Sequence, residues 1–284
     1  MTRASFRAGL LRTLALAVLV LLVGVTYQGV ATAIERRQFP RPGRLVDVGG
    51  HQLHLHCIGK GSPVVVLEAP AAGMSASWGW VQEQLGATTR VCAYDRAGQG
   101  WSENRDGYST GIEAIELHAL LASGGERGPF VVAGAGLGAS LATIFASRFP
   151  KDVTALVLVD EPRAEEPAAR GNAFTHLSAL SPWLARAGLL RASRALGSLT
   201  DGLPEPSAGA LNTFLNRPDH LTRAVEELSR WSQITTAARQ APMPPSVRVT
   251  RLDVIGRRPV AFLATERDAS LVTAALRNAV ELRR

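Results

Sequence analysis

The sequence contains short apolar runs that alternate with longer, helix-like segments. The runs are rich in Val, Leu and Ala, and most are separated by enough residues to form a helix. A strand inside a parallel sheet reads as such a continuous apolar run, because helices cover both of its faces. The runs are Val64–Glu68, Arg90–Tyr94, Phe130–Ala133, Ala155–Val159 and Pro259–Ala264. The alternation therefore predicts an α/β fold built on a mostly parallel sheet.

A β-hairpin is predicted before the first of these runs. Arg44–Val48 and His51–Ile58 have the composition of strands, and Gly49-Gly50 between them is suited to a tight turn. An antiparallel pair of strands therefore opens the domain.

The alternation stops between residues 161 and 246. Leucines in this stretch recur at near-helical spacing, which indicates helices. They are Leu177, Leu180, Leu184, Leu189 and Leu190. We predict a helical cap over residues 161–246, inserted into an α/β core formed by residues 44–160 and 247–284. The leucines either pack the cap against the sheet, which is the commoner arrangement, or line a pocket for an apolar ligand.

Residues 13–34 are almost entirely apolar, and about 20 such residues can cross the hydrocarbon core of a bilayer. The segment is either a retained anchor or a signal peptide cut near Ala33, in the small-residue sequence Ala31-Thr32-Ala33. Its length favours the anchor. We predict a cytoplasmic N-terminus over residues 1–12, a transmembrane helix over 13–34 and a linker over 35–43. In both alternatives the folded body lies outside the cytoplasm, membrane-anchored in the first and secreted or periplasmic in the second.

The net charge is +7, but the distribution of the basic residues argues against nucleic acid as a partner. Much of the basic excess flanks the apolar segment and forms no separate basic face. The flanking residues are Arg3, Arg7, Arg12, Arg36, Arg37, Arg41 and Arg44. This distribution is typical of a membrane segment.

The chain has two cysteines, Cys57 and Cys92, which lie in separate apolar runs. Buried free cysteines commonly behave as small apolar residues. We predict two separate buried thiols.

A glycine-rich turn follows the run Phe130–Ala133 and precedes a helix-like segment. Strand, tight turn and helix are the setting of a nucleophile elbow, G-x-S-x-G, but this sequence has Gly136 at the central position. Glycine tolerates the strained backbone of such a turn and supplies no hydroxyl. A dinucleotide-binding turn is disfavoured, because the spacing departs from G-x-G-x-x-G unless Ala139 takes the last position. The acidic residue that would bind the ribose is also missing, because none ends the next strand before Asp160. We predict no cofactor and no metal.

Three segments resemble the α/β-hydrolase superfamily of esterases, lipases and related enzymes. They are Val46–Cys57, Val64–Ala69 and Tyr94–Ser102, and the last, Tyr-Asp-Arg-x-Gly-x-Gly-x-Ser, is the most specific. The resemblance covers roughly residues 44–268. It implies the superfamily's fold and a catalytic order of nucleophile, acid and histidine.

Few of the implied catalytic groups are present. The nucleophile corresponds to Gly136, and Ser140 is the nearest hydroxyl. The acid corresponds to Asp268, which is also a plausible N-cap for a helix from Ala269 onward. No histidine follows Asp268. The resemblance further implies oxyanion-hole donors at the backbone N–H groups of Leu137 and Ala71.

The sequence ends after one further predicted helix, Leu271–Leu282, where the family continues with a strand, a histidine loop and a last helix. We therefore expect Pro259–Ala264 to be an exposed edge strand that favours self-association.

The functional hypothesis is a membrane-tethered, catalytically inactive member of this superfamily that keeps a ligand- or partner-binding role, with a small apolar or acyl ligand as one candidate. One alternative is an active carboxylic-ester hydrolase with an unconventional nucleophile. Another is a truncated gene product without function.

Overall fold

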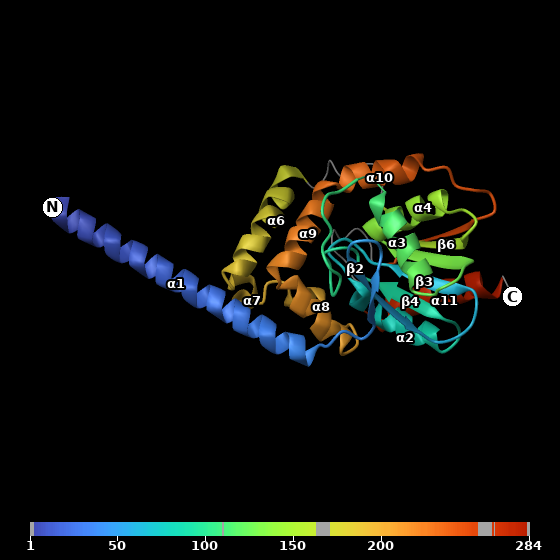
Figure 1. Cartoon of the computed structure of the whole chain (residues 1–284), viewed down its shortest axis with the longest axis horizontal. Coiled ribbons are helices and arrows are strands. Elements are labelled where there is room, and N and C mark those ends of the chain that lie inside the picture. The colour runs from blue at the N-terminus through green and yellow to red at the C-terminus, as the bar shows by residue number, and fades with distance from the viewer. Residues whose placement is uncertain (1–2, 110, 163–170, 255–262, 264, 283–284) are drawn as a thin grey trace.

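The computed structural model describes residues 3–109, 111–162, 171–254, 263 and 265–282. Within them the strands form one seven-stranded sheet of order β1-β2-β4-β3-β5-β6-β7 (Figure 1). β1 and β2 are antiparallel, β2 and β4 are antiparallel, and the other neighbours are parallel. The strands are β1 (Arg44–Asp47), β2 (Gln52–Ile58), β3 (Val64–Glu68), β4 (Val91–Tyr94), β5 (Phe130–Ala135), β6 (Val153–Val159) and β7 (Arg248–Leu252). The predicted α/β fold with a mostly parallel sheet is confirmed.

Helices cover both faces of the sheet. α3 (Ile112–Ser123) and α4 (Leu137–Arg148) pack against the face that carries Val64 and Val66. On the other face, α2 (Gly79–Gly86) and α11 (Glu266–Glu281) pack against Val65 and Leu67. Successive β3 side chains thus enter opposite cores, as strand geometry requires. This double burial explains why the central strands read as continuous apolar runs.

Strand β7 was not predicted from the sequence. It holds Arg248 and Arg251 and is largely exposed, so it lacks the apolar run by which the buried strands were recognised. It pairs in parallel with β6 and is the last strand of the described sheet. The predicted strand Pro259–Ala264 lies outside the described residues except for Leu263, which is buried. The expected exposed edge at Pro259–Ala264 therefore stays a prediction.

The described residues between β6 and β7 are mainly helical. α10 packs on α4, α6 on α9, and α8 on the 3₁₀ turn η1 (Ser75–Trp78). The elements are α6 (Gly171–Arg186), α7 (Leu189–Ser193), the 3₁₀ turn η2 (Gly197–Leu199), α8 (Ser207–Leu215), α9 (Pro218–Ser229) and α10 (Trp231–Gln240). Helices α8, α9 and α10 thereby reach over the strand ends that build the site.

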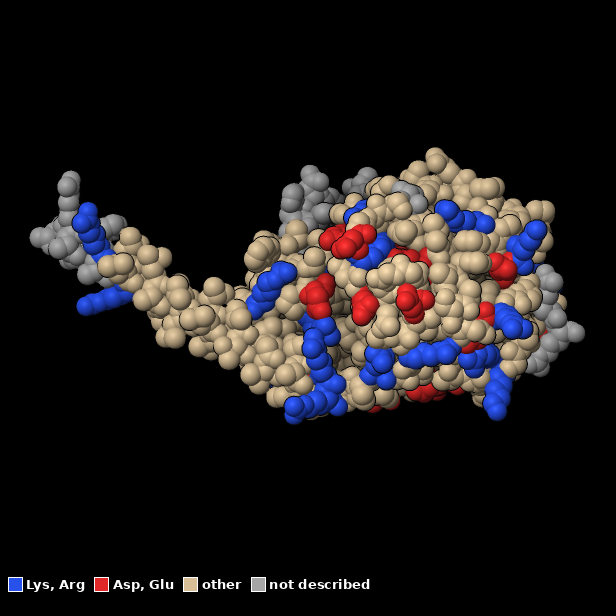
Figure 2. All heavy atoms as spheres, in the orientation of Figure 1, with Lys and Arg blue, Asp and Glu red and all other residues tan. Residues whose placement is uncertain are grey.

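Helix α1 (Arg3–Gln38) projects away from the body of the molecule (Figure 1). From Gly9 to Gln38 it is long and apolar enough to cross a membrane, and its most apolar stretch is not buried in the protein. Figure 2 shows basic side chains at its free end and an uncharged stretch between them and the body. Its last turns contact the inserted helices: the buried Gln28 donates from its amide to the backbone oxygen of Asn216 at 2.8 Å.

Cys57 and Cys92 form a disulfide. The prediction of two separate thiols is wrong because the sheet order differs from the chain order. β2 lies directly beside β4, and the register sets Cys57 opposite Cys92. Residues 35 positions apart in sequence are therefore cross-strand neighbours.

Candidate functional site

The turn between β5 and α4 has the conformation of a sharp elbow. Gly136 has φ of 53° and ψ of −123°, and its N–H donates to the backbone oxygen of Val159 at 2.9 Å. Positive φ is strained for residues with a side chain. The turn keeps the shape in which a nucleophile would be presented, with glycine at its centre.

The three glycines of the elbow serve different purposes. A Cβ atom at Gly134 would lie 2.2 Å from the backbone oxygen of Gly138, and one at Gly138 would lie 2.4 Å from that of Ala69. These two positions exclude any side chain. At Gly136 the nearest atom to such a Cβ is Cβ of Pro70, at 3.8 Å, an ordinary contact. The site therefore has room for the side chain that it lacks.

The two predicted oxyanion donors lie in one buried cluster. Leu137 begins α4, so its N–H has no partner within the helix. Leu137 and Ala71, from the loop after β3, pack with Leu141 and with Ile234 of α10. Helix α10 thus covers the elbow, and a role of Leu137 and Ala71 as an oxyanion hole stays a prediction.

The two other candidate residues, Ser140 and Asp268, are held in helices by burial or by hydrogen bonds. Ser140 is buried within α4 and is 2% exposed. The N-cap of α11 is Thr265, and Asp268 is the third residue of that helix, which corrects the suggestion that Asp268 caps it. The Asp268 N–H donates to Oγ1 of Thr265 at 3.1 Å, and the Thr265 hydroxyl donates to the Asp268 carboxylate at 2.6 Å. Extended backbone at Thr265 allows this reciprocal cap, and the helix starts five residues before the predicted Leu271.

His220 of α9 is buried between two core loops. Its Nδ1 accepts from the Gly100 N–H at 3.1 Å, so Nε2 carries the proton and donates to the Ala72 oxygen at 3.0 Å. Burial lowers the pKa of His220. The ring is therefore a neutral bridge between α9 and the core, with both nitrogens in use.

His54 of β2 is also fully buried, and its Nδ1 lies 2.9 Å from Oδ2 of Asp95. Burial alone would raise the pKa of Asp95, but His54 and the N–H groups of Ser75 and Trp101 lower it below its usual value. This pair anchors the loop after β4.

Arg96 organises the loop after β3. Its Nη1 donates to Glu68 Oε1 at 2.6 Å and to the Ala69 oxygen at 2.7 Å, and its Nη2 donates to the Pro70 oxygen at 2.9 Å. Burial raises the pKa of Glu68 although Arg96 and the Tyr94 hydroxyl oppose this. Guanidinium geometry suits such a fixed fork of donors.

The same guanidinium joins the core to the inserted helices. Its Nε donates to Oε1 of Glu227, in α9, at 2.8 Å. The Ala72 N–H and the Gln99 amide both donate to the other oxygen of Glu227. Sequence analysis did not single out this cluster. The available signal was Glu68, a charge at the end of a buried strand, which needs a partner.

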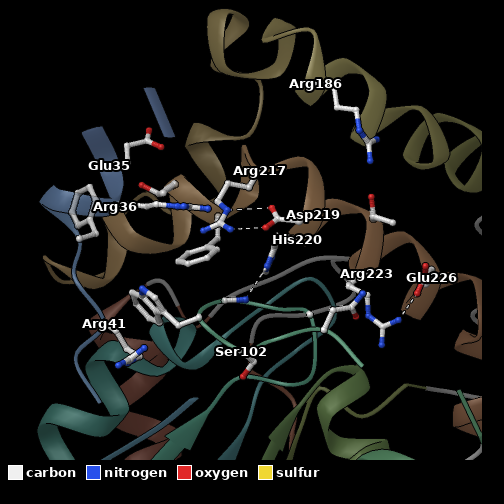
Figure 3. Close-up of a pocket in the computed structure, with 18 residues that line it drawn as sticks. Glu35, Arg36, Arg41, Ser102, Arg186, Arg217, Asp219, His220, Arg223 and Glu226 are labelled. Carbon is white, nitrogen blue, oxygen red and sulfur yellow. Dashed lines mark hydrogen bonds and ion pairs between the residues drawn. The ribbon is translucent and has the colours of Figure 1, made fainter. Parts of the chain in front are cut away.

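A cavity of about 450 Å³ lies beside these contacts (Figure 3). Its walls come from the end of α1, the loop after β4, and helices α6, α8 and α9. The aromatic residues Phe39, Trp101 and Phe214 contribute apolar surface. Arginines dominate its charge, and Arg217 and Arg223 are paired with Asp219 and Glu226. Within the described residues, Arg36, Arg41 and Arg186 have no acidic partner.

The cavity was not predicted from the sequence, because the arginines around residue 40 were assigned to the flank of a membrane segment. The cavity is distinct from the elbow in its lining, which includes neither Gly136 nor Leu137.

Comparison with known proteins agrees with the fold. The sequence model of the Alpha/beta hydrolase family matches residues 53–283. The chain belongs to this family. A family member that is similar in sequence is the 2-hydroxy-6-oxo-2,4-heptadienoate hydrolase of Pseudomonas putida, 34% identical over 41% of this chain and 44% of the relative. The 2-hydroxymuconate semialdehyde hydrolase of a Pseudomonas species is 29% identical over 46% of this chain and 48% of the relative.

Two solved structures share the fold at low sequence identity. The Cif epoxide hydrolase from Acinetobacter nosocomialis has a TM-score of 0.65 at 14% identity and covers 90% of this chain and 96% of its own. Cfl2 from Burkholderia cenocepacia has a TM-score of 0.64 at 20% identity, with coverages of 84% and 97%. In sequence, the matched region spans less than half the length of the first curated relatives.

Proposed function

We propose that this α/β-hydrolase family member is a membrane-anchored binding protein that does not hydrolyse esters through a serine nucleophile. The observation that carries the proposal is Gly136, an elbow with room for a side chain and no hydroxyl. Enzymes that lose their catalytic triad retain roughly a thousandfold acceleration over water, which is hard to detect in an ordinary assay. Two similar proteins are named hydrolases, so this departure from them needs a direct test.

The proposed ligand site is the arginine-lined cavity. Arg36, Arg41 and Arg186 offer positive charge without an acidic partner among the described residues, while aromatic rings supply apolar surface. Such a combination suits an amphiphile that has an acyl or other apolar body and a carboxylate or phosphate end. The helices α6–α10 then act as the cap of this binding site.

Anchoring through a retained α1 is supported by the contacts of its C-terminal half. A Cβ at Gly24 would lie 2.2 Å from the backbone oxygen of Ala187, so α1 closely approaches the end of α6 there. Gln28 is bonded to Asn216 and also accepts from Arg191 at 3.0 Å. Cleavage near Ala33 would remove all of these contacts.

The disulfide supports a location outside the cytoplasm. Disulfides persist in oxidising compartments and are rare in reducing ones. The Cys57–Cys92 bond therefore fits a domain on the outer side of the membrane.

The catalytic part of the proposal is tested on the full chain in lipid nanodiscs with short-chain p-nitrophenyl esters. We expect no turnover above that of empty nanodiscs. Saturable turnover that disappears in Ser140→Ala would contradict the proposal and favour an unconventional nucleophile. Saturable turnover that survives in Ser140→Ala would contradict the role as a binding protein and would exclude Ser140 as the nucleophile.

The binding part is tested with a fluorescent fatty acid as the probe. We expect saturable binding that weakens at least tenfold in the double variant Arg36→Gln/Arg41→Gln, since each lost charge-assisted contact contributes about 1.5–3 kcal/mol. Arg127→Gln, an exposed position outside the cavity lining, serves as the control with unchanged affinity. Equal affinity in the double variant and the wild type would exclude the cavity as the site.

A further inference from the structure

The helices α6 and α7 expose a row of large apolar side chains. Leu180, Trp183, Leu184 and Leu189 are 54%, 69%, 38% and 52% exposed. We call these four residues the cap apolar face. A fully solvated surface rarely gathers so many large apolar side chains, and such a patch commonly marks an interaction site.

The charged residues of α6 and α7 themselves are all basic, although Arg191 pairs with Glu35 of α1. No acidic residue occurs from Gly171 to Thr200, whereas Arg186, Arg191 and Arg194 lie in or beside α6 and α7. The Arg186 guanidinium lies 5.1 Å from the centroid of the Trp183 ring. Apolar residues with an aromatic ring and interspersed arginines are typical of segments that lie in the interface of an anionic membrane.

The position of α1 sets the height of this face relative to a bilayer. Leu14–Val25 forms the most continuous apolar run, and Gly24 contacts Ala187, which directly follows α6. Because Gly24 and Gln28 contact the inserted helices, the part of α1 left to cross the bilayer is shifted toward the N-terminus relative to the predicted segment 13–34. A helix rises about 1.5 Å per residue, so Ala8 to Val25 spans about 27 Å, close to the hydrocarbon thickness of about 30 Å, with the long side chain of Arg12 extending to the headgroups. The end of the membrane segment is thus level with the end of α6.

We propose that the cap apolar face docks on the surface of the bilayer that α1 crosses, with Trp183 among the headgroups and Arg186 and Arg194 close to anionic lipids. The proposal rests on the proposed anchoring by α1. It follows from continuity: the face adjoins the point where the apolar helix meets the cap, and the positive charge complements a negative membrane surface. Because Arg186 also lines the arginine-rich cavity, docking turns that side of the cavity toward the lipid.

The test uses tryptophan fluorescence of the full chain in vesicles of phosphatidylcholine and phosphatidylglycerol. Phosphatidylcholine brominated near the top of its acyl chains quenches tryptophans that reach the interface. We expect brominated lipid to quench the wild type more than Trp183→Phe. Trp80→Phe is the matched control, since Trp80 bonds to the Gly202 oxygen and packs at the core, and it should be quenched like the wild type.

Flotation of the vesicles separates the two proposals. If the protein does not float with the vesicles, or if alkaline carbonate releases it from them, the proposed anchoring fails. If it floats but Trp183→Phe and the wild type are quenched equally, docking alone is overturned. If aqueous acrylamide quenches Trp183, the face is solvated. If neither quencher reaches Trp183, a second copy of this chain covers the face. Each result contradicts docking.

Discussion

At the scale of single residues, the glycines of the elbow have two different roles. Two of them are needed for packing, and the third replaces a catalytic side chain. Gly134 and Gly138 are required because backbone oxygens occupy the space of a side chain. Gly136 is not required in this sense, because only its positive φ favours glycine. Gly136, the position at which a catalytic family member would carry its nucleophile, therefore has space for a side chain.

This distinction predicts unequal effects of two alanine substitutions. Gly136→Ala should lower the free energy of unfolding by about 1–2 kcal/mol, the cost of a side chain at left-handed φ. Gly138→Ala should cost more than about 3 kcal/mol, since its Cβ meets the backbone oxygens of Ala69 and Glu68. Denaturant unfolding of both variants, followed by circular dichroism in detergent, measures the difference. Equal losses would refute the packing argument.

Glu116 of α3 predicts a pH dependence of stability. Burial raises the pKa of this carboxyl to about 7, although the adjacent Arg105 opposes the shift. Because the folded pKa exceeds the unfolded one, folding favours the protonated form. The contribution of Glu116 to stability should therefore fall as the pH rises from the unfolded pKa of about 4.3 to about 7, and then stay constant.

Unfolding free energies measured at intervals from pH 4.5 to 8 check this sign. Glu116→Gln should flatten the decline within that window, and the exposed Glu83→Gln should leave it unchanged. A decline that is identical in Glu116→Gln and the wild type would rule out Glu116 as its source.

At the scale of secondary-structure elements, the contact between α9 and the loop after β3 depends on Arg96 and Glu227. Glu227→Ala should destabilise the protein by about 3 kcal/mol, because it leaves a buried guanidinium with one carboxylate in place of two. It should also make α8–α10 more sensitive to limited proteolysis. Glu226→Ala, which removes a partly exposed partner of Arg223, should cost less than about 1 kcal/mol. Similar losses in both variants would argue against a linking role.

The sequence predicted the elements that are buried on both faces and missed those whose formation depends on neighbours. Val64–Glu68 was found because burial makes it a continuous apolar run. The exposed strand Arg248–Leu252 has no such run. The disulfide was missed because strand order, which sets Cys57 beside Cys92, is a property of the whole sheet. The elbow was recognised from its glycines, but the arginine-lined cavity combines segments distant in sequence, from Arg36 to Arg223.

At the scale of the whole molecule, the C-terminal half of α1 contacts the helices inserted between β6 and β7. Gly24 and Gly29 both lie in α1, but only a side chain at Gly24 would collide with a backbone atom, the oxygen of Ala187. Gly24→Leu should keep the protein in the membrane and expose α6 to protease. Gly29→Leu, with nothing within 4 Å of its Cβ, should match the wild type. Unchanged protection of α6 in Gly24→Leu would indicate that this contact does not hold the cap.

The central claim is that the elbow holds no serine nucleophile. The most direct measurement is the intact mass of the full-length protein after incubation with a fluorophosphonate, which forms a covalent adduct with activated serines. We expect an unmodified mass under conditions that fully label an active serine hydrolase. A stoichiometric adduct at Ser140 or any other serine would contradict it.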